Sequence, residues 1–517
     1  MARFVRWTAL TAAAALLATG CSGGSSSDGG EAGGETSGAS SPGTSTGSAT
    51  TLPASLTKQK LDWGRCKASG GAPAPGDEWQ CASLKAPLDW AKPEGRTIDL
   101  ALIRAKAGGG GDRIGSLLFN FGGPGSSGVS TLPWYASNAS ELGERYDLVS
   151  WDPRGVGASE GVRCRSDKEI QAAESVDITP DTPAEETAYF REAAAFGKGC
   201  QKSTGKLMAH VSTTDTARDM DLMRQVLGDT KTHYFGISYG TELGGVYAHL
   251  FPKNVGRLIL DAVADPSADA SGHVENQARG FQRALDNYLK STGQGAEEGT
   301  QEIVDLLKRI DERPLPTGSE RKLTESLALT GLLRPLYSEA SWPTLTSALD
   351  AAEQGDGSEL LALADEYNDR DPSGHYVTGT HSQRVISCLD DKQRPTAEEA
   401  RKLLPRFEKV SPVFGPMLGW DTAGWCHDWP VAGQYETPEV SAPGAAPILL
   451  VGNTGDPATP YEGTRKMAEE LGKGVGVTLT WKGEGHAAYG KGSDCVDSAI
   501  NAYLLQGTVP KDGKVCS

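Results

Sequence analysis

The sequence lacks several features that each mark a particular class of protein. Beyond residue 18 no apolar run is long enough to span a membrane, so the rest of the chain is expected to be soluble. No Cys-x-x-Cys pair is present, which argues against a cysteine-based metal site. The formal net charge of −17 argues against nucleic acid as a partner and favours solubility outside the cell.

Cysteines are few but informative. Setting Cys21 aside leaves eight, an even number at wide spacings, which favours disulfides in an oxidising compartment. Eight cysteines allow about a hundred pairings. Pairing of sequence neighbours closes the shortest loops, and it predicts the disulfides Cys66–Cys81, Cys164–Cys200, Cys388–Cys426 and Cys495–Cys516.

The first 20 residues have the pattern of an export signal. Arg3 and Arg6 precede a short Ala/Leu-rich segment over 8–18. Leu17-Ala18-Thr19-Gly20-Cys21 resembles a bacterial lipoprotein box, which predicts cleavage before Cys21 and a lipid on its thiol. Ordinary secretory cleavage with an incidental cysteine is the alternative. Residues 21–55 are mostly Gly, Ser, Thr and Ala, which predicts a disordered tether. Contact with a membrane is expected only through the lipid.

A glycine-flanked serine is the centre of the remaining pattern. The segment Gly236-Ile237-Ser238-Tyr239-Gly240 follows an apolar stretch and precedes a helical one. This order predicts a strand, a sharp turn and a helix, with the Ser238 hydroxyl at the helix N-terminus. Such a serine also occurs in ordinary loops, so its interpretation depends on the rest of the chain.

Short apolar segments alternate with helical stretches along much of the chain. They cover residues 82–88, 98–103, 115–121, 146–151, 233–237, 255–260, 446–451 and 475–481. This alternation predicts an α/β fold, a mainly parallel sheet with helices on both faces and its active site at the carboxyl ends of the strands. The glycine-rich loop 122–128 follows one such strand, and no Gly-Lys-Ser/Thr follows it, which makes a nucleotide P-loop unlikely.

Helical periodicity replaces the strand pattern from residue 267 to residue 442. We therefore predict an α/β core over 56–266 and 443–517, interrupted by a helical cap over 267–442 that covers the active site. Four tryptophans in this cap either line a pocket or, as we favour, form core: Trp342, Trp420, Trp425 and Trp429.

Four motifs together resemble those of the secreted actinobacterial tripeptidyl aminopeptidases, α/β-hydrolases related to proline iminopeptidases. They lie at residues 120–125 (NFGGPG), 151–157 (WDPRGVG), 236–241 (GISYGT) and 452–457 (GNTGDP), the last with Gly485-His486. The resemblance implies removal of short peptides, tripeptides foremost, from free N-termini, without metal or cofactor. An esterase or lipase that uses the same residues is the alternative.

The resemblance and the chain order expected on this fold indicate a catalytic triad of Ser238, Asp456 and His486. Asp261 and Asp265 are rival acids, because they follow the strand after Ser238. The backbone N–H groups of Tyr239 and Gly123 are expected to form the oxyanion hole, since Pro124 has no N–H to donate.

An aminopeptidase needs a carboxylate to bind the α-ammonium of its substrate. Glu242, one helical turn after Ser238, is one candidate, and Asp390 and Asp391 in the cap are others. A structural ion pair between Glu242 and a basic core residue is the alternative for that residue. Asp152 and Arg154 are expected to form a second structural ion pair.

Overall fold

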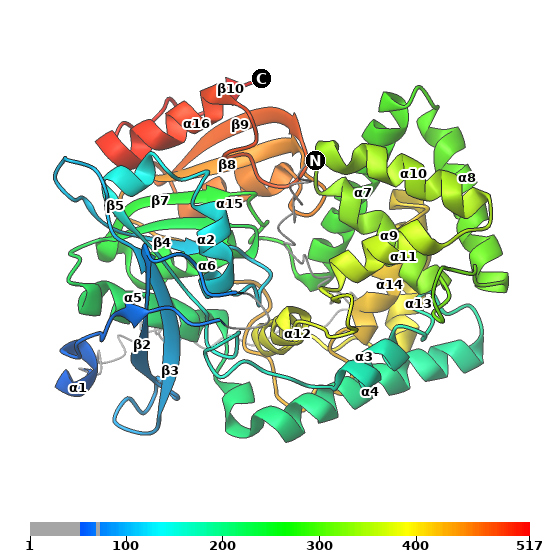
Figure 1. Cartoon of the computed structure of the whole chain (residues 1–517), viewed down its shortest axis with the longest axis horizontal. Helices are drawn as coiled ribbons and strands as arrows, with labels where there is room; N and C mark the ends of the chain where they lie inside the picture. Colours follow the sequence, from blue (N-terminus) through cyan, green and yellow to red (C-terminus); the bar gives the residue numbers. More distant parts are fainter. Residues whose placement is uncertain (1–51, 69–72) are drawn as a thin grey trace, which may run out of the picture.

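The computed structural model describes residues 52–68 and 73–517. Figure 1 shows a twisted sheet with its helices on the left and a lobe of helices on the right. The expected export signal, Cys21 and most of the tether lie outside the described residues. Within the described ranges, no helix has both the length and the apolar character needed to cross a bilayer.

The sheet has ten strands in the order β1-β2-β3-β5-β4-β6-β7-β8-β9-β10. All neighbours from β5 to β10 are parallel, and β1, β2 and β3 join antiparallel at one edge. This arrangement confirms the predicted fold class. The strands are β1 (Gly64–Arg65), β2 (Trp79–Pro87), β3 (Thr97–Ala105), β4 (Gly115–Asn120), β5 (Tyr146–Trp151), β6 (Thr232–Ile237), β7 (Val255–Asp261), β8 (Ile448–Gly455), β9 (Gly476–Glu484) and β10 (Lys514–Cys516).

Both faces of the sheet are covered, which explains why its central strands are continuous apolar runs. In β4, Leu117 and Phe119 pack on one side and Leu118 packs on the other, all of them buried. The first side is covered by α2 (Gly128–Tyr135) and α16 (Asp494–Asn501), and the second by α5 (Thr213–Leu227), α6 (Tyr239–Leu250) and α15 (Glu462–Leu471).

The chain between β7 and β8 is helical and builds the lobe around a hydrophobic core of its own. Trp342 belongs to that core, and Trp420 and Trp429 are buried in neighbouring clusters. The helices are α7 (Ala270–Ser291), α8 (Ala296–Glu312), α9 (Glu325–Leu336), α10 (Trp342–Glu353), α11 (Ser358–Tyr367), α12 (Gly379–Asp390), α13 (Ala397–Val410) and α14 (Gly415–Gly424).

The lobe also recruits two helices from the segment expected to be core. Helices α3 (Asp167–Ala173) and α4 (Pro183–Thr204) run along the underside of the lobe in Figure 1. The Tyr189 hydroxyl of α4 donates to Asp421 of α14 at 2.7 Å. Conversely, α12 lies between the two parts and contributes apolar side chains to the core under the sheet.

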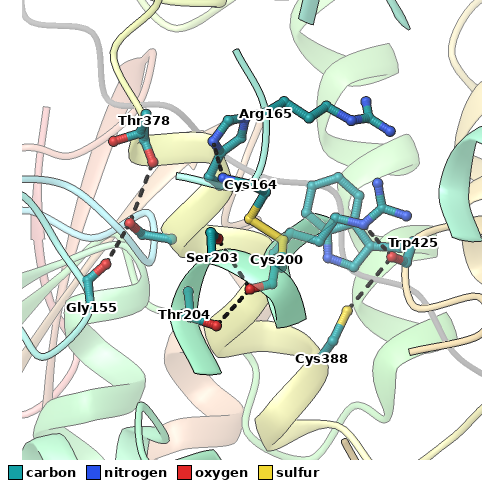
Figure 2. The surroundings of a disulfide bond; sticks show 12 residues. Gly155, Cys164, Arg165, Cys200, Ser203, Thr204, Thr378, Cys388 and Trp425 are labelled. Carbon is teal, nitrogen blue, oxygen red and sulfur yellow. Dashed lines mark hydrogen bonds between the residues drawn. A yellow bond between two sulfur atoms is a disulfide. The ribbon is translucent and has the colours of Figure 1, made fainter. Parts of the chain in front are cut away.

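The four expected disulfides are present: Cys66–Cys81, Cys164–Cys200, Cys388–Cys426 and Cys495–Cys516. Figure 2 shows the second pair beside Cys388 of the third, whose Sγ lies 3.6 Å from the Trp425 carbonyl oxygen. Four disulfides fit folding in an oxidising compartment.

The prediction of an ion pair between Asp152 and Arg154 is wrong. The Arg154 guanidinium instead donates to both carboxylate oxygens of Asp219, at 2.6 and 2.7 Å, and both side chains are fully buried. Asp152 accepts from the Ser127 hydroxyl at 2.6 Å and from the Ala158 N–H at 2.8 Å. The partner of Arg154 lies on α5, far along the chain, where a local motif does not reveal it.

Candidate active site

Ser238 lies between β6 and α6 in a backbone conformation that non-glycine residues rarely adopt, with φ 59° and ψ −126°. The flanking glycines make this turn possible. A Cβ on Gly236 would lie 2.3 Å from the Gly240 carbonyl oxygen, and one on Gly240 would lie 2.9 Å from the Asn120 carbonyl oxygen. The close packing holds Ser238 at the N-terminus of α6, where the helix dipole favours negative charge.

The structure brings His486 and Asp456 together. The Nδ1 atom of His486 lies 2.9 Å from both carboxylate oxygens of Asp456, and both side chains are buried. Asp456 is itself fixed by the N–H groups of Ala458 and Thr459, at 3.0 and 2.9 Å. With Nδ1–H donated to Asp456, Nε2 of the neutral ring is the atom left to accept a proton.

The Nε2 atom of His486 is buried and has no hydrogen-bond partner within the described part of the chain. The imidazole packs edge-on against the ring of Tyr337, at 5.5 Å between ring centroids. The backbone N–H of His486 also donates to the Tyr337 carbonyl oxygen at 2.9 Å. Because Tyr337 directly follows α9, the lobe helps to position this histidine.

Asp261 is close to the histidine loop but makes different contacts. Its carboxylate accepts from the N–H groups of Ala488 and Tyr489 at 3.0 Å each, and burial raises its pKa to about 6. It therefore holds the backbone beside His486, whereas Asp456 contacts the imidazole. The other rival, Asp265, lines the cleft and accepts from Ser267.

The glycine-rich loop packs directly on the nucleophile turn. A Cβ on Gly122 would lie 2.8 Å from the Ser238 Cβ, and the Gly122 N–H is already donated to the Asn120 side chain at 3.0 Å. Gly123 and Tyr239 line the cleft beside Ser238. On the opposite side of the loop, the Gln383 side chain of α12 donates to the Gly123 carbonyl oxygen at 3.2 Å.

Two carboxyl groups line the cleft at Ser238 and a smaller cavity that adjoins it at Tyr239 and Glu242. Glu242 lines the cleft together with Ser238 and accepts from the Tyr435 hydroxyl at 3.3 Å. The alternative role of Glu242, an ion pair with a basic core residue, is therefore not what the structure shows. Burial raises the pKa of Glu242 to about 7. Asp390 lines the continuation of the cleft and accepts from the N–H and hydroxyl of Thr213, at 2.9 and 2.6 Å. Burial, and Glu242 nearby, raise its pKa well above the usual range.

Comparison with known proteins shows which family the chain resembles. Residues 115–297 match the alpha/beta hydrolase fold model, and residues 411–516 match the TAP-like protein model. The serine protease Hip1 of Mycobacterium tuberculosis is 36% identical over 89% of this chain and 91% of its own length. Carboxylesterase B of the same organism is 32% identical over 90% and 91%. The tripeptidyl aminopeptidase of Streptomyces lividans is 28% identical over 90% and 88%.

The chain belongs to the tripeptidyl aminopeptidase family of α/β-hydrolases. It is therefore a serine hydrolase with peptidase activity. Asp391, the third acidic candidate, lines the same adjoining cavity as Asp390 and accepts from the Gln393 N–H at 2.9 Å.

Sequence reasoning missed several residues that shape the cleft of this peptidase. Tyr435, Thr213 and Gln383 contact Glu242, Asp390 or the glycine-rich loop 122–128 from elements that no motif marks. Across residues 52–68 and 73–517, no group of three or more His, Cys, Asp and Glu side chains is arranged to hold a metal ion.

Proposed function

We propose that this peptidase releases short peptides, tripeptides foremost, from free N-termini by acyl transfer to Ser238. The observation that carries the proposal is the pair Glu242 and Asp390, two enclosed carboxyl groups on the cleft that begins at Ser238. An ammonium group enclosed there gains a charge-assisted partner, whereas a neutral N-acetyl group gains none.

In the proposed reaction, His486 Nε2 takes the proton of the Ser238 hydroxyl as its oxygen attacks the scissile carbonyl carbon. Asp456 keeps the proton on Nδ1 and stabilises the imidazolium that forms. The N–H groups of Tyr239 and Gly123 donate to the oxyanion. His486 then gives the proton to the departing amine, and water hydrolyses the acyl-enzyme by the same steps.

The test compares a free N-terminal peptide with its N-acetylated twin. One charge-assisted contact of about 2–3 kcal/mol corresponds to a preference of about thirty- to more than a hundredfold in kcat/KM. Glu242→Gln should reduce that preference. Glu462→Gln is the matched control, because Glu462 lines the same cleft but already pairs with Arg283 at 2.7 Å. Equal rates on both peptides would remove the aminopeptidase proposal.

An esterase is the second candidate, favoured by the relative named carboxylesterase B. Simple esters carry no ammonium for Glu242 and Asp390 to bind. Esterase activity should therefore be insensitive to Glu242→Gln, and an ester hydrolysed faster than every free peptide would support this second function.

We also propose that the chain is exported and anchored by a lipid on Cys21. The N-terminal pattern and the four disulfides support this proposal. Cys21→Ser should move the enzyme from the membrane fraction to the soluble fraction of an expressing actinobacterium. An unchanged distribution would contradict the anchor.

A further inference from the structure

A second cavity, of about 300 Å³, lies inside the lobe and plays no part in the chemistry described above. Helices α4, α9, α12 and α14 supply most of its wall. Gln383 belongs to that wall and also donates to the Gly123 carbonyl oxygen in the glycine-rich loop 122–128. Tyr367 belongs to it too, and its ring packs against Tyr337, which contacts His486. The cavity thus lies behind the catalytic centre, and it shares no lining residue with the cleft at Ser238.

Arg384 is the notable charge in this cavity. Its guanidinium donates to the carbonyl oxygens of Trp425 and, at 2.9 Å, Gly424 at the end of α14, and it lies over the rings of Phe196 and Trp425. Desolvation lowers its pKa to about 10. Within the described ranges no carboxylate lies within ion-pair distance of it, although Asp421 and Glu192 in the same wall attract it. Arg165, also in this wall, pairs directly with Glu192.

A neutral donor accompanies this cation. The Trp425 indole Nε1 is buried without a hydrogen-bond partner, although Trp425 lines the cavity. A buried indole N–H normally has an acceptor. A guanidinium without an ion pair and an N–H without a partner together call for an acceptor that is negatively charged.

Resting on the peptidase function proposed above, we infer that this cavity binds the carboxylate of the departing product. The acidic cleft takes the amine end of the substrate, and Arg384 with Trp425 takes a carboxylate beyond the scissile bond. That group is either the C-terminal α-carboxylate of a short peptide or an acidic side chain just after the cut. The enzyme would then select short or acidic peptides by charge at both ends.

A purely structural role for Arg384 is the competing explanation, since a cation at a helix C-terminus satisfies carbonyl groups and the helix dipole. Such a role affects the melting temperature of the protein but not its choice between substrates. The test therefore uses a ratio of substrates within each variant.

The experiment measures kcat/KM for peptides with one, two or three residues after the scissile bond, each as free acid and as C-terminal amide. At one length or more, the wild type should prefer the acid by at least about tenfold. Arg384→Gln should bring the acid-to-amide ratio close to one, and Trp425→Phe, which keeps a ring over Arg384, should lower it less. Arg401→Gln, an exposed arginine on α13, should keep the wild-type ratio. A comparison of amidated peptides that carry Glu or Gln directly after the scissile bond shows whether the bound carboxylate is that of a side chain.

A wild-type ratio near one for every length and for the Glu–Gln pair would overturn the inference. So would a ratio unchanged in folded Arg384→Gln. If free peptides are not cut at all, the function proposed above fails on its own, and dipeptide acids and amides are compared as inhibitors of ester hydrolysis. Stronger inhibition by the acids then supports the carboxylate site, and equal inhibition rejects it.

Discussion

In the function proposed above, the substrate cleft has a catalytic half and a recognition half, and the two are built in different ways. In the catalytic half, Ser238, Asp456 and His486 all follow sheet strands. In the recognition half, each contact joins two distant elements: Asp390 of α12 accepts from Thr213 of α5, and Tyr435 donates to Glu242 of α6. Under this proposal the sheet holds the catalytic residues, while substrate choice depends on how the lobe docks.

The largest effect should come from the nucleophile. Ser238→Ala should reduce turnover of every substrate by about 10⁴-fold or more, because the attacking oxygen is lost while the turn can still form. Hydrolysis assays and thermal unfolding measure this, with Ser271→Ala on α7 as control. Turnover within tenfold of the parent would show that the sheet half does not carry the reaction.

The next effect separates the two buried acids. Asp456→Asn should lower kcat by about 10⁴-fold, because the carboxylate that holds the imidazole tautomer is lost. Asp261→Asn should act mainly on stability, since Asp261 accepts from the backbone of Ala488 and Tyr489. Kinetics and melting curves of both variants decide between them. If only Asp261→Asn loses activity, Asp456 is not the acid of the triad.

In the recognition half, pH should change the ratio between substrates. The pKa of Glu242 is raised to about 7 by burial, so the carboxylate is neutralised as pH falls through 7. The α-ammonium of a peptide is lost as pH rises through about 8. The free-to-acetylated preference should therefore peak near pH 7–8 and fall several-fold by pH 6. In Glu242→Gln the acid limb should be flattened, and a limb that persists there would assign it to another group.

The smallest effect concerns the arginine cavity. Asp421 shares its wall with Arg384, accepts from Tyr189 and faces Tyr367, and burial raises its pKa to about 6. Below pH 6 its repulsion of a bound carboxylate disappears, while a peptide α-carboxylate stays ionised. The acid-to-amide ratio should rise a few-fold from pH 7.5 to pH 5. Asp421→Asn should remove this rise, and a ratio independent of pH in the wild type would contradict it.

The same contrast explains what the sequence could predict. The turn at Ser238 is encoded locally, because Gly236 and Gly240 stand where backbone oxygen atoms leave no room for a side chain. The apolar strands in turn encode the sheet. Likewise, neighbouring cysteines pair because their loops are short.

The partners that cross the molecule were not predictable from one sequence. The local motif predicts Asp152, two residues away, as the partner of Arg154, whereas the actual partner Asp219 lies on α5. Helix α4 contacts both parts, because Phe196 and Cys200 pack in the core under the sheet while Tyr189 joins the lobe. Residues such as Gln383 and Arg384 carry no motif, and only the docking of α12 gives them neighbours in the site.

Strand β8 pairs with β7 even though lobe helices α7 to α14 lie between them in the chain. Ser238 is therefore synthesised before these eight helices, whereas Asp456 and His486 are synthesised after them. A growing chain carries its nucleophile for the whole of that interval without a base, and domains generally fold in the order of synthesis. A fragment that ends within the lobe is thus an inert protein, not an unregulated protease inside the cell that makes it.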